Sequence, residues 1–184
     1  MKTIRIFLAS SEELNDDRIA FGALIYKLDM YFKEKEVRIK LYEWEDLDAA
    51  YNNRRKQDEY NDKVRKSDIF IALFHQKAGR FTIEEFDVAY EEFNKKAFPR
   101  IEVYCKDIKE GEVESEELKG FKQRVTDLGF TCKSYANKES FKLQFTEQLL
   151  QYIKEQSVTT IEDDILKTND DGIVTFAGKR IAKV

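Results

Sequence analysis

The sequence predicts an α/β fold in which helices cover both faces of a parallel sheet. Five segments of strand length alternate along the chain with five segments whose apolar residues recur at helical spacing. The segment from Ile69 to Phe74 (IFIALF) is apolar at every position, as expected for a strand buried on both faces of a parallel sheet. Strands and helices that alternate in this way are joined by right-handed crossovers.

The first strand, helix and second strand occupy the start of the chain. Thr3 to Ala9 (TIRIFLA) predicts a strand, and Val37 to Trp44 predicts another because its first apolar residues alternate. Between them Ser10-Ser11-Glu12-Glu13 matches a capping box and predicts a helix start. The buried face of that helix is predicted to hold Leu14, Phe21, Leu24, Ile25, Leu28, Tyr31 and Phe32.

A polar segment separates the second strand from the third. Residues 45–58 predict a loop, with Asn52-Asn53 as the turn signal and a basic group at Arg54, Arg55 and Lys56. On composition alone, we interpret these basic residues as part of a solvated loop. A short helix is predicted from about Glu59 to Lys66, before the strand Ile69 to Phe74.

The helix after the third strand is predicted to span residues 82–96. Thr82 followed by Glu85 matches a capping box and places Thr82 at the N-cap. The buried face is predicted to hold Ile83, Phe86, Ala89, Tyr90 and Phe93.

The remaining elements complete the alternation. Pro99 precedes a predicted strand from Arg100 to Cys105, residues 107–117 predict an acidic loop, and residues 118–128 predict a helix that ends at Gly129. Phe130 to Tyr135 predicts the fifth strand. Asn137 is predicted to cap a last helix whose apolar face holds Phe141, Phe145, Leu149, Tyr152 and Ile153.

Five strands in this alternation predict a flavodoxin-like three-layer sandwich with strand order 2-1-3-4-5. In such a sheet, ligands bind at the carboxyl ends of the strands where the strand order reverses, here between the first and third strands. We therefore expect functional side chains at Ser10–Glu13, Trp44–Asp48 and His75–Glu85.

The end of the chain has a different pattern. Asp171-Gly172 is a hairpin turn signal between Ile165-Leu166 and the run Ile173 to Phe176. We therefore predict one domain over residues 1–156. Residues 157–184 are interpreted as a linker or as the start of a further element such as a β-hairpin, which would make this chain one end of a longer protein.

Composition narrows the function classes. The net charge of −4 argues against a general nucleic-acid binder. No apolar segment approaches a membrane span, and no signal-peptide pattern follows Met1, which favours the cytoplasm. The two cysteines, Cys105 and Cys132, are too few for a disulfide framework and are interpreted as strand residues.

Several common chemistries of this fold are excluded by the residues present. A phosphate-accepting receiver domain needs acidic residues where this chain has Ser10-Ser11 and Phe74-His75. No GxxxxGK[ST] loop, GxGxxG fingerprint or GxSxG elbow occurs. With a single histidine and no Cys/His cluster, no metal site is predicted.

The remaining carboxylates, serines and aromatics suit cleavage of a glycosidic bond at a ribose. A carboxylate stabilises the oxocarbenium-like transition state by charge or by covalent attack. If the leaving group is nicotinamide, it departs from a cationic pyridinium as a neutral molecule. A general acid is then unnecessary, and a single glutamate can suffice. Aromatic side chains would stack on the bases, and Lys77 or Arg80 would meet a diphosphate.

Four motifs in order resemble a bacterial TIR (Toll/interleukin-1 receptor) domain: IRIFLASS, WED, SDIFIALF and T-x-x-EF-x-x-A, within about residues 3–155. The resemblance implies the five-stranded fold above, NAD+ as substrate with no cofactor, self-association, and roles in antiviral defence or cell death. It implies Glu85 as the catalytic residue, because Glu85 precedes Phe86 at the start of the helix after the third strand. Family members often show W-x-x-x-E, whereas here Trp44 is followed by Asp48.

The predicted site therefore contains one catalytic residue and a substrate-binding set. Glu85 is the catalyst, and the binding residues are Ser10, Ser11, Trp44, Asp48, His75, Lys77, Arg80 and Phe81. The resemblance places a frequent assembly surface at about Asp46–Asp58. Predicted partners are NAD+, further copies of the chain and a domain or protein beyond residue 184, with no membrane and no nucleic acid.

Other interpretations stay open at this point. Glu85 can be a helix cap, Glu84 competes with it, Trp44 can be a core residue, and His75 can be structural. The chain can also be a non-catalytic TIR assembly module, or an enzyme similar to nucleoside deoxyribosyltransferases, which use a catalytic glutamate at a ribose.

Overall fold

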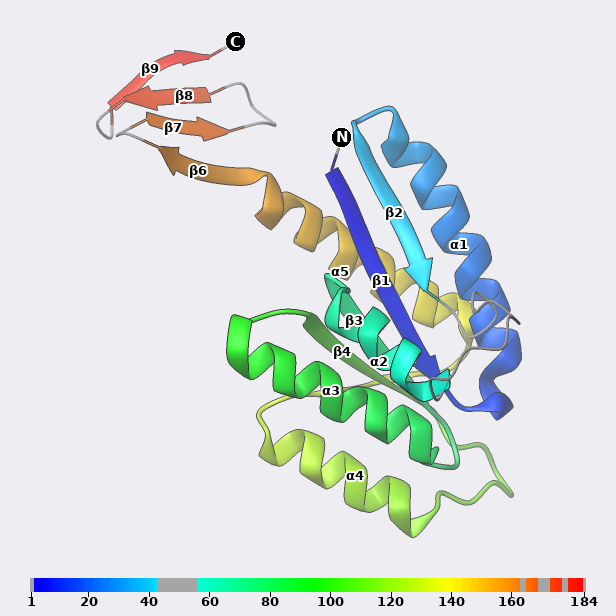
Figure 1. Ribbon diagram of the computed structural model, residues 1–184. Coiled ribbons are helices and arrows are strands. Elements are labelled where there is room, and N and C mark those ends of the chain that lie inside the picture. The colour runs from blue at the N-terminus through cyan, green and yellow to red at the C-terminus, as the bar shows by residue number, and fades with distance from the viewer. Residues whose placement is uncertain (1, 43–55, 163–164, 169–172, 177–178, 184) are drawn as a thin grey trace. The chain divides into compact units, whose positions relative to one another are not determined.

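The computed structural model of the chain describes residues 2–42, 56–162, 165–168, 173–176 and 179–183 (Figure 1). It divides into two compact units, residues 1–141 and residues 142–184. The candidate functional residues lie in the first unit, so its architecture is described first.

The first unit is built on the predicted parallel sheet. Its strands are β1 (Lys2–Ser10), β2 (Val37–Tyr42), β3 (Ile69–Phe74), β4 (Arg100–Lys106) and β5 (Cys132–Tyr135). All neighbours pair in parallel, in the order β2-β1-β3-β4-β5. The flavodoxin-like fold class predicted from the sequence is therefore confirmed. The central strand β3 is buried at every residue, which is why its sequence is apolar throughout.

Helices cover both faces of this sheet. They are α1 (Asn15–Lys33, after a short 3₁₀ turn at Glu12–Leu14), α2 (Lys56–Arg65), α3 (Arg80–Lys96), α4 (Glu116–Asp127) and the start of α5 (Lys138–Ser157). Buried residues of α2, α3 and α4 form one cluster with side chains from β1, β3 and β4. On the other face, Phe141 at the start of α5 stacks on Phe21 of α1, with ring centroids 5.2 Å apart.

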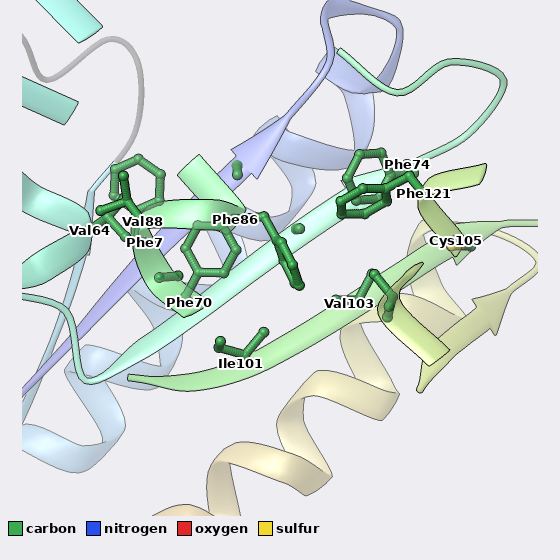
Figure 2. Close-up of a cluster of buried hydrophobic side chains, with 14 of the residues drawn as sticks. Phe7, Val64, Phe70, Phe74, Phe86, Val88, Ile101, Val103, Cys105 and Phe121 are labelled. Atoms are coloured by element: carbon green, nitrogen blue, oxygen red, sulfur yellow. The ribbon is translucent and has the colours of Figure 1, made fainter. Parts of the chain in front are cut away.

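Phe86 fixes the position of α3 on the sheet. It is fully buried, and its ring lies 6.5 Å from that of Phe70 on β3 and 5.1 Å from that of Phe121 on α4. Figure 2 shows this cluster, with Val64 of α2 beside Phe7 and Val88. Because successive helical residues are turned by about 100°, a fixed Phe86 also fixes the direction of its neighbour Glu85.

Two predicted capping boxes are wrong. Helix α3 begins at Arg80 with Gly79 as N-cap and no side-chain cap, so Thr82 lies inside the first turn and Glu85 in the second. Ser10 ends β1 and caps no helix, because Ser11 and then Leu14 stand at the helix starts that follow. The Ser/Thr-x-x-Glu pattern is local, and it cannot show that a helix has already begun.

Two other helix ends agree with the sequence. Asn137 Oδ1 accepts hydrogen bonds from the backbone N–H groups of Glu139 and Ser140, both at 3.0 Å, and so caps α5. Gly129 follows α4 at φ 85°, and Phe130 N donates to Val125 O at 3.0 Å. These are features of a Schellman ending, which favours glycine.

The two cysteines are more than strand residues. Cys105 on β4 and Cys132 on β5 form a disulfide with their Cα atoms 6.0 Å apart. The sequence could not predict this pairing because it depends on the register of two neighbouring strands.

The second unit contains the end of α5 and an antiparallel sheet. Its strands are β6 (Val158–Glu162), β7 (Ile165–Thr168), β8 (Ile173–Phe176) and β9 (Lys179–Lys183), in that order. Strands β7 and β8 pair antiparallel on either side of the predicted Asp171-Gly172 turn, which lies outside the described residues. The domain boundary at residue 156 stays a prediction. Within the described residues, no helix is long and apolar enough to cross a membrane.

Candidate active site

A cleft of about 530 Å³ lies at the carboxyl ends of β1 and β3. Ser10, Ser11 and Glu12 line it where β1 ends, Arg18 lines it from α1, and the start of α3 contributes residues 79–82. The cleft is therefore at the point where the strand order reverses, which is where the sequence placed a ligand site.

A second cavity of about 460 Å³ is bounded by Ser11, Glu12, Glu13, Lys77 and Gly79. Glu13 connects the two chain segments that bound this cavity. Its Oε1 accepts hydrogen bonds from Ser11 Oγ at 3.1 Å and from the backbone N–H groups of Gln76 and Lys77 at 3.2 Å. This carboxylate thus ties the segment after β1 to the segment after β3.

Glu85, near the cleft, is a fully buried carboxyl group with a raised pKa. Its side chain is fully buried, and Oε1 accepts one hydrogen bond, from Gln57 Nε2 at 3.3 Å. Its Oε2 has no hydrogen-bond partner within the described part of the chain. Burial raises the pKa of Glu85 to about 7, against the lowering effect of the Gln57 hydrogen bond, and the nearby charge of Glu84 raises it further.

Two amides of α2 complete the surroundings of Glu85. Asn61 Nδ2 donates to Glu84 Oε1 at 3.0 Å, and Gln57 Nε2 lies 3.4 Å from Asn61 Oδ1. Gln57 and Asn61 are both buried. Sequence reasoning missed them because the predicted helix began at residue 59 and left Gln57 in a loop. The signal was present: both amides are spaced four apart and share the α2 segment with buried Tyr60 and Val64.

Glu85 lies one helical turn below the cleft. Thr82 lines the cleft and is buried, and side chains three residues apart on a helix are neighbours. Among the described residues, however, neither cavity is lined by Glu85. Gln57 of α2 lies against it instead.

The predicted substrate-binding residues fall into three groups. Ser10, Ser11, Arg80 and Phe81 line the larger cleft, and Lys77 lines the second cavity beside Ser11. Trp44 and Asp48 lie outside the described residues. His75 is in neither cavity.

His75 instead anchors the segment before α4. Its Nε2 lies 2.9 Å from Glu112 Oε2, and the same carboxylate oxygen accepts the backbone N–H of Lys109 at 2.8 Å. The Lys109 hydrogen bond and the His75 contact lower the pKa of Glu112. No group of three or more His, Cys, Asp or Glu in the described ranges could hold a metal ion.

No protein-family model matches the chain, and no curated protein matches it in sequence. Solved structures do resemble it. The Clostridium botulinum CMP N-glycosidase BcmB has a TM-score of 0.47 at 13% identity, covering 78% of this chain and 98% of that one. The RPS4 and RRS1 TIR domain heterodimer has a TM-score of 0.43 at 11% identity, covering 84% and 97%. A conserved protein from Enterococcus faecalis has a TM-score of 0.44 at 13% identity, covering 79% of this chain and 99% of that one. The solved structures similar to this chain thus include an N-glycosidase and a TIR domain.

Proposed function

We propose that this chain cleaves an N-glycosidic bond at a ribose, with Glu85 as the catalytic carboxylate. The observation that carries this proposal is the state of Glu85: fully buried, with one carboxylate oxygen lacking a hydrogen-bond partner among the described residues. A carboxylate that only stabilised the fold would be expected to have partners for both oxygens. Glu85 also caps no helix, since α3 begins at Arg80.

The chemistry follows from the charge of the transition state. When the glycosidic bond breaks, positive charge develops on the ribose carbon and ring oxygen. A carboxylate in a water-poor site stabilises that charge more strongly than it would in water. Only the ionised form of Glu85 can do this, and a pKa of about 7 leaves a substantial ionised fraction at neutral pH.

The proposed substrate is NAD+, and this choice comes from the resemblance to TIR domains. Nicotinamide leaves as a neutral molecule, so cleavage needs no general acid. This suits the site around Glu85. Asp17 also has a buried, unpartnered oxygen among the described residues, but its other oxygen pairs with Lys106 Nζ at 2.7 Å. Glu84 differs because Asn61 donates to it. The same resemblance leads us to propose self-association through the segment of about Asp46–Asp58. Residues 46–55 lie outside the described residues, and residues 56–58 begin α2.

The test compares two glutamate-to-glutamine variants. Glu85→Gln keeps the shape of the side chain and an oxygen that can accept from Gln57, but it removes the charge. We expect it to fold like the wild type and to lose NAD+ cleavage by about 100-fold or more, in line with the loss of a principal transition-state contact. Glu84→Gln is the matched control, because it removes the same charge one residue away, and we expect it to keep substantial activity.

The readout is nicotinamide release beside a thermal melting curve, under conditions where the wild type is active. Wild-type rates from Glu85→Gln would exclude the catalytic role. Incubation with CMP, the compound named for one similar structure, and with deoxynucleosides separates other N-glycosidic substrates from NAD+. A chain that releases no base from any of these would be the non-catalytic assembly module.

A further inference from the structure

The cleft above Glu85 has a positive balance of charge. Arg80 and Arg18 line it, one exposed and the other half-buried, and Glu12 is the one carboxylate among its described lining residues. Two positive charges and one negative charge leave a net charge of +1. This is unlike the protein as a whole, which carries −4. The cleft is therefore suited to an anionic part of a ligand.

The amino end of α3 adds to this charge. Helix α3 has 17 residues, its N-cap Gly79 supplies no side-chain acceptor, and its first turn contains no acidic residue. The first N–H groups of a helix have no acceptor within the helix and carry partial positive charge, which makes this end a common site for phosphate. Residues 79–82 line the cleft, so this end of α3 faces it.

A buried hydroxyl provides independent evidence of a ligand. Ser10 lines the same cleft and is only 7% exposed, yet its Oγ has no hydrogen-bond partner in the described residues. Leaving a buried hydroxyl without a partner is unfavourable. A ligand oxygen in the cleft would supply the missing partner.

Gly79 keeps these groups close together. A Cβ at this position would lie 3.4 Å from Thr82 Oγ1 and 3.8 Å from Ser11 Cβ. Those are ordinary contact distances, so any side chain larger than alanine would extend into the space between the end of β1 and the start of α3. The small residue thus preserves the mouth of the cleft.

We propose that this cleft is a phosphate-binding subsite, formed by Ser10, Arg18, Arg80 and the amino end of α3, which holds the phosphate of a phosphorylated ribose. Its position fits the reaction. With a rise of 1.5 Å per residue, the five steps from Arg80 to Glu85 span about 7.5 Å along α3. The site would thus select nucleotides over nucleosides.

The link to Glu85 rests on the proposed function, but phosphate binding does not. The test therefore uses ribose 5-phosphate, which has no base to lose, and ribose as its uncharged counterpart. Isothermal titration calorimetry with the full chain is expected to show ribose 5-phosphate binding at least about tenfold more tightly than ribose. The difference should shrink as salt is added, because an exposed charge is screened.

Single substitutions assign the subsite to its residues. Arg80→Gln should weaken ribose 5-phosphate binding by about tenfold, the effect expected for one charge-assisted hydrogen bond. Ser10→Ala should weaken it by a smaller factor. Arg65→Gln is the matched control, because Arg65 is exposed on α2 and pairs with Asp62 at 3.1 Å. Glu12→Gln removes the opposing charge and should leave binding unchanged or tighter.

Equal affinities for ribose 5-phosphate and ribose would overturn the proposal, as would equal losses in Arg80→Gln and Arg65→Gln. If Arg80→Gln has a lowered melting temperature, its weaker binding could reflect misfolding, and Ser10→Ala then becomes the deciding variant. A Ser10→Ala chain that binds ribose 5-phosphate as tightly as the wild type would count against the subsite. The two proposals fail separately. Phosphate binding without base release refutes only the catalytic proposal, and base release without phosphate preference refutes only the subsite.

Discussion

Glu85 is placed by its neighbour in the sequence. Phe86 is fixed in the core between β3 and α4, and the turn of the helix then directs Glu85 toward α2 rather than toward solvent. Burial raises its pKa to about 7, while the Gln57 hydrogen bond opposes that rise and the charge of Glu84 adds to it. Two single substitutions should therefore move this pKa in opposite directions.

The pH profile of NAD+ cleavage provides that test. The rate requires ionised Glu85, so we expect it to rise with pH and to reach half its maximum near pH 7. Gln57→Leu removes a donor that favours the ionised form and should move the midpoint to higher pH. Glu84→Gln removes a negative charge and should move it to lower pH. Shifts in the same direction, or none, would show that another group controls the rate.

At the scale of single elements, the helix ends show where local sequence decides structure. Gly129 follows helix α4, and its φ of 85° is unfavourable for residues with a Cβ. Gly120 lies within the same helix, and a Cβ there would meet no atom within 4 Å. Gly120 thus has a helical backbone that alanine also favours, whereas Gly129, just after the helix, has a backbone that strains alanine.

Replacing each glycine by alanine should change stability with opposite sign. Gly129→Ala should lower the free energy of unfolding by about 1–2 kcal/mol, because alanine is strained in the left-handed region. Gly120→Ala should raise it by about 0.5–1 kcal/mol, since alanine is the better helix former. Urea titration of both variants measures the two values. A stabilised Gly129→Ala chain would contradict the helix ending described here.

At the scale of the whole molecule, the sequence and the structure place the end of the first domain at different residues. The sequence predicts a domain that ends at residue 156, whereas the structure divides into compact units after residue 141, within α5. The predicted apolar face of α5 continues beyond that division, at Phe145, Leu149 and Tyr152. The sequence boundary therefore keeps all of α5 except its last residue, Ser157, whereas the structural division cuts the helix after its first turn.

Two shortened chains distinguish these boundaries. The chain cut after Gln156 should unfold in one cooperative transition near the wild-type melting temperature, because α5 and its apolar face are almost complete. The chain cut after Phe141 should lose that transition or melt well below the wild type. Circular dichroism at increasing temperature measures both. If both chains melt alike, the part of α5 beyond residue 141 contributes nothing to the first unit.

The sequence by itself determined the fold and the location of the cleft. Alternating strand and helix patterns, with an all-apolar segment from Ile69 to Phe74, are enough to predict a parallel sheet, because burial on both faces leaves no polar alternation. The strand order then places the ligand site after β1 and β3, where the structure has its cleft. Gly129 and Asn137 were also predictable, since helix endings of these types use nearby backbone groups.

Only the tertiary structure decided what surrounds Glu85. Gln57 and Glu85 are 28 residues apart, and their hydrogen bond exists because α2 packs on α3. The Cys105–Cys132 disulfide likewise depends on the register of β4 and β5. Periodicity records which face of an element is buried. It does not record which polar side chain of a distant element meets that face, and the raised pKa of Glu85 depends on that arrangement.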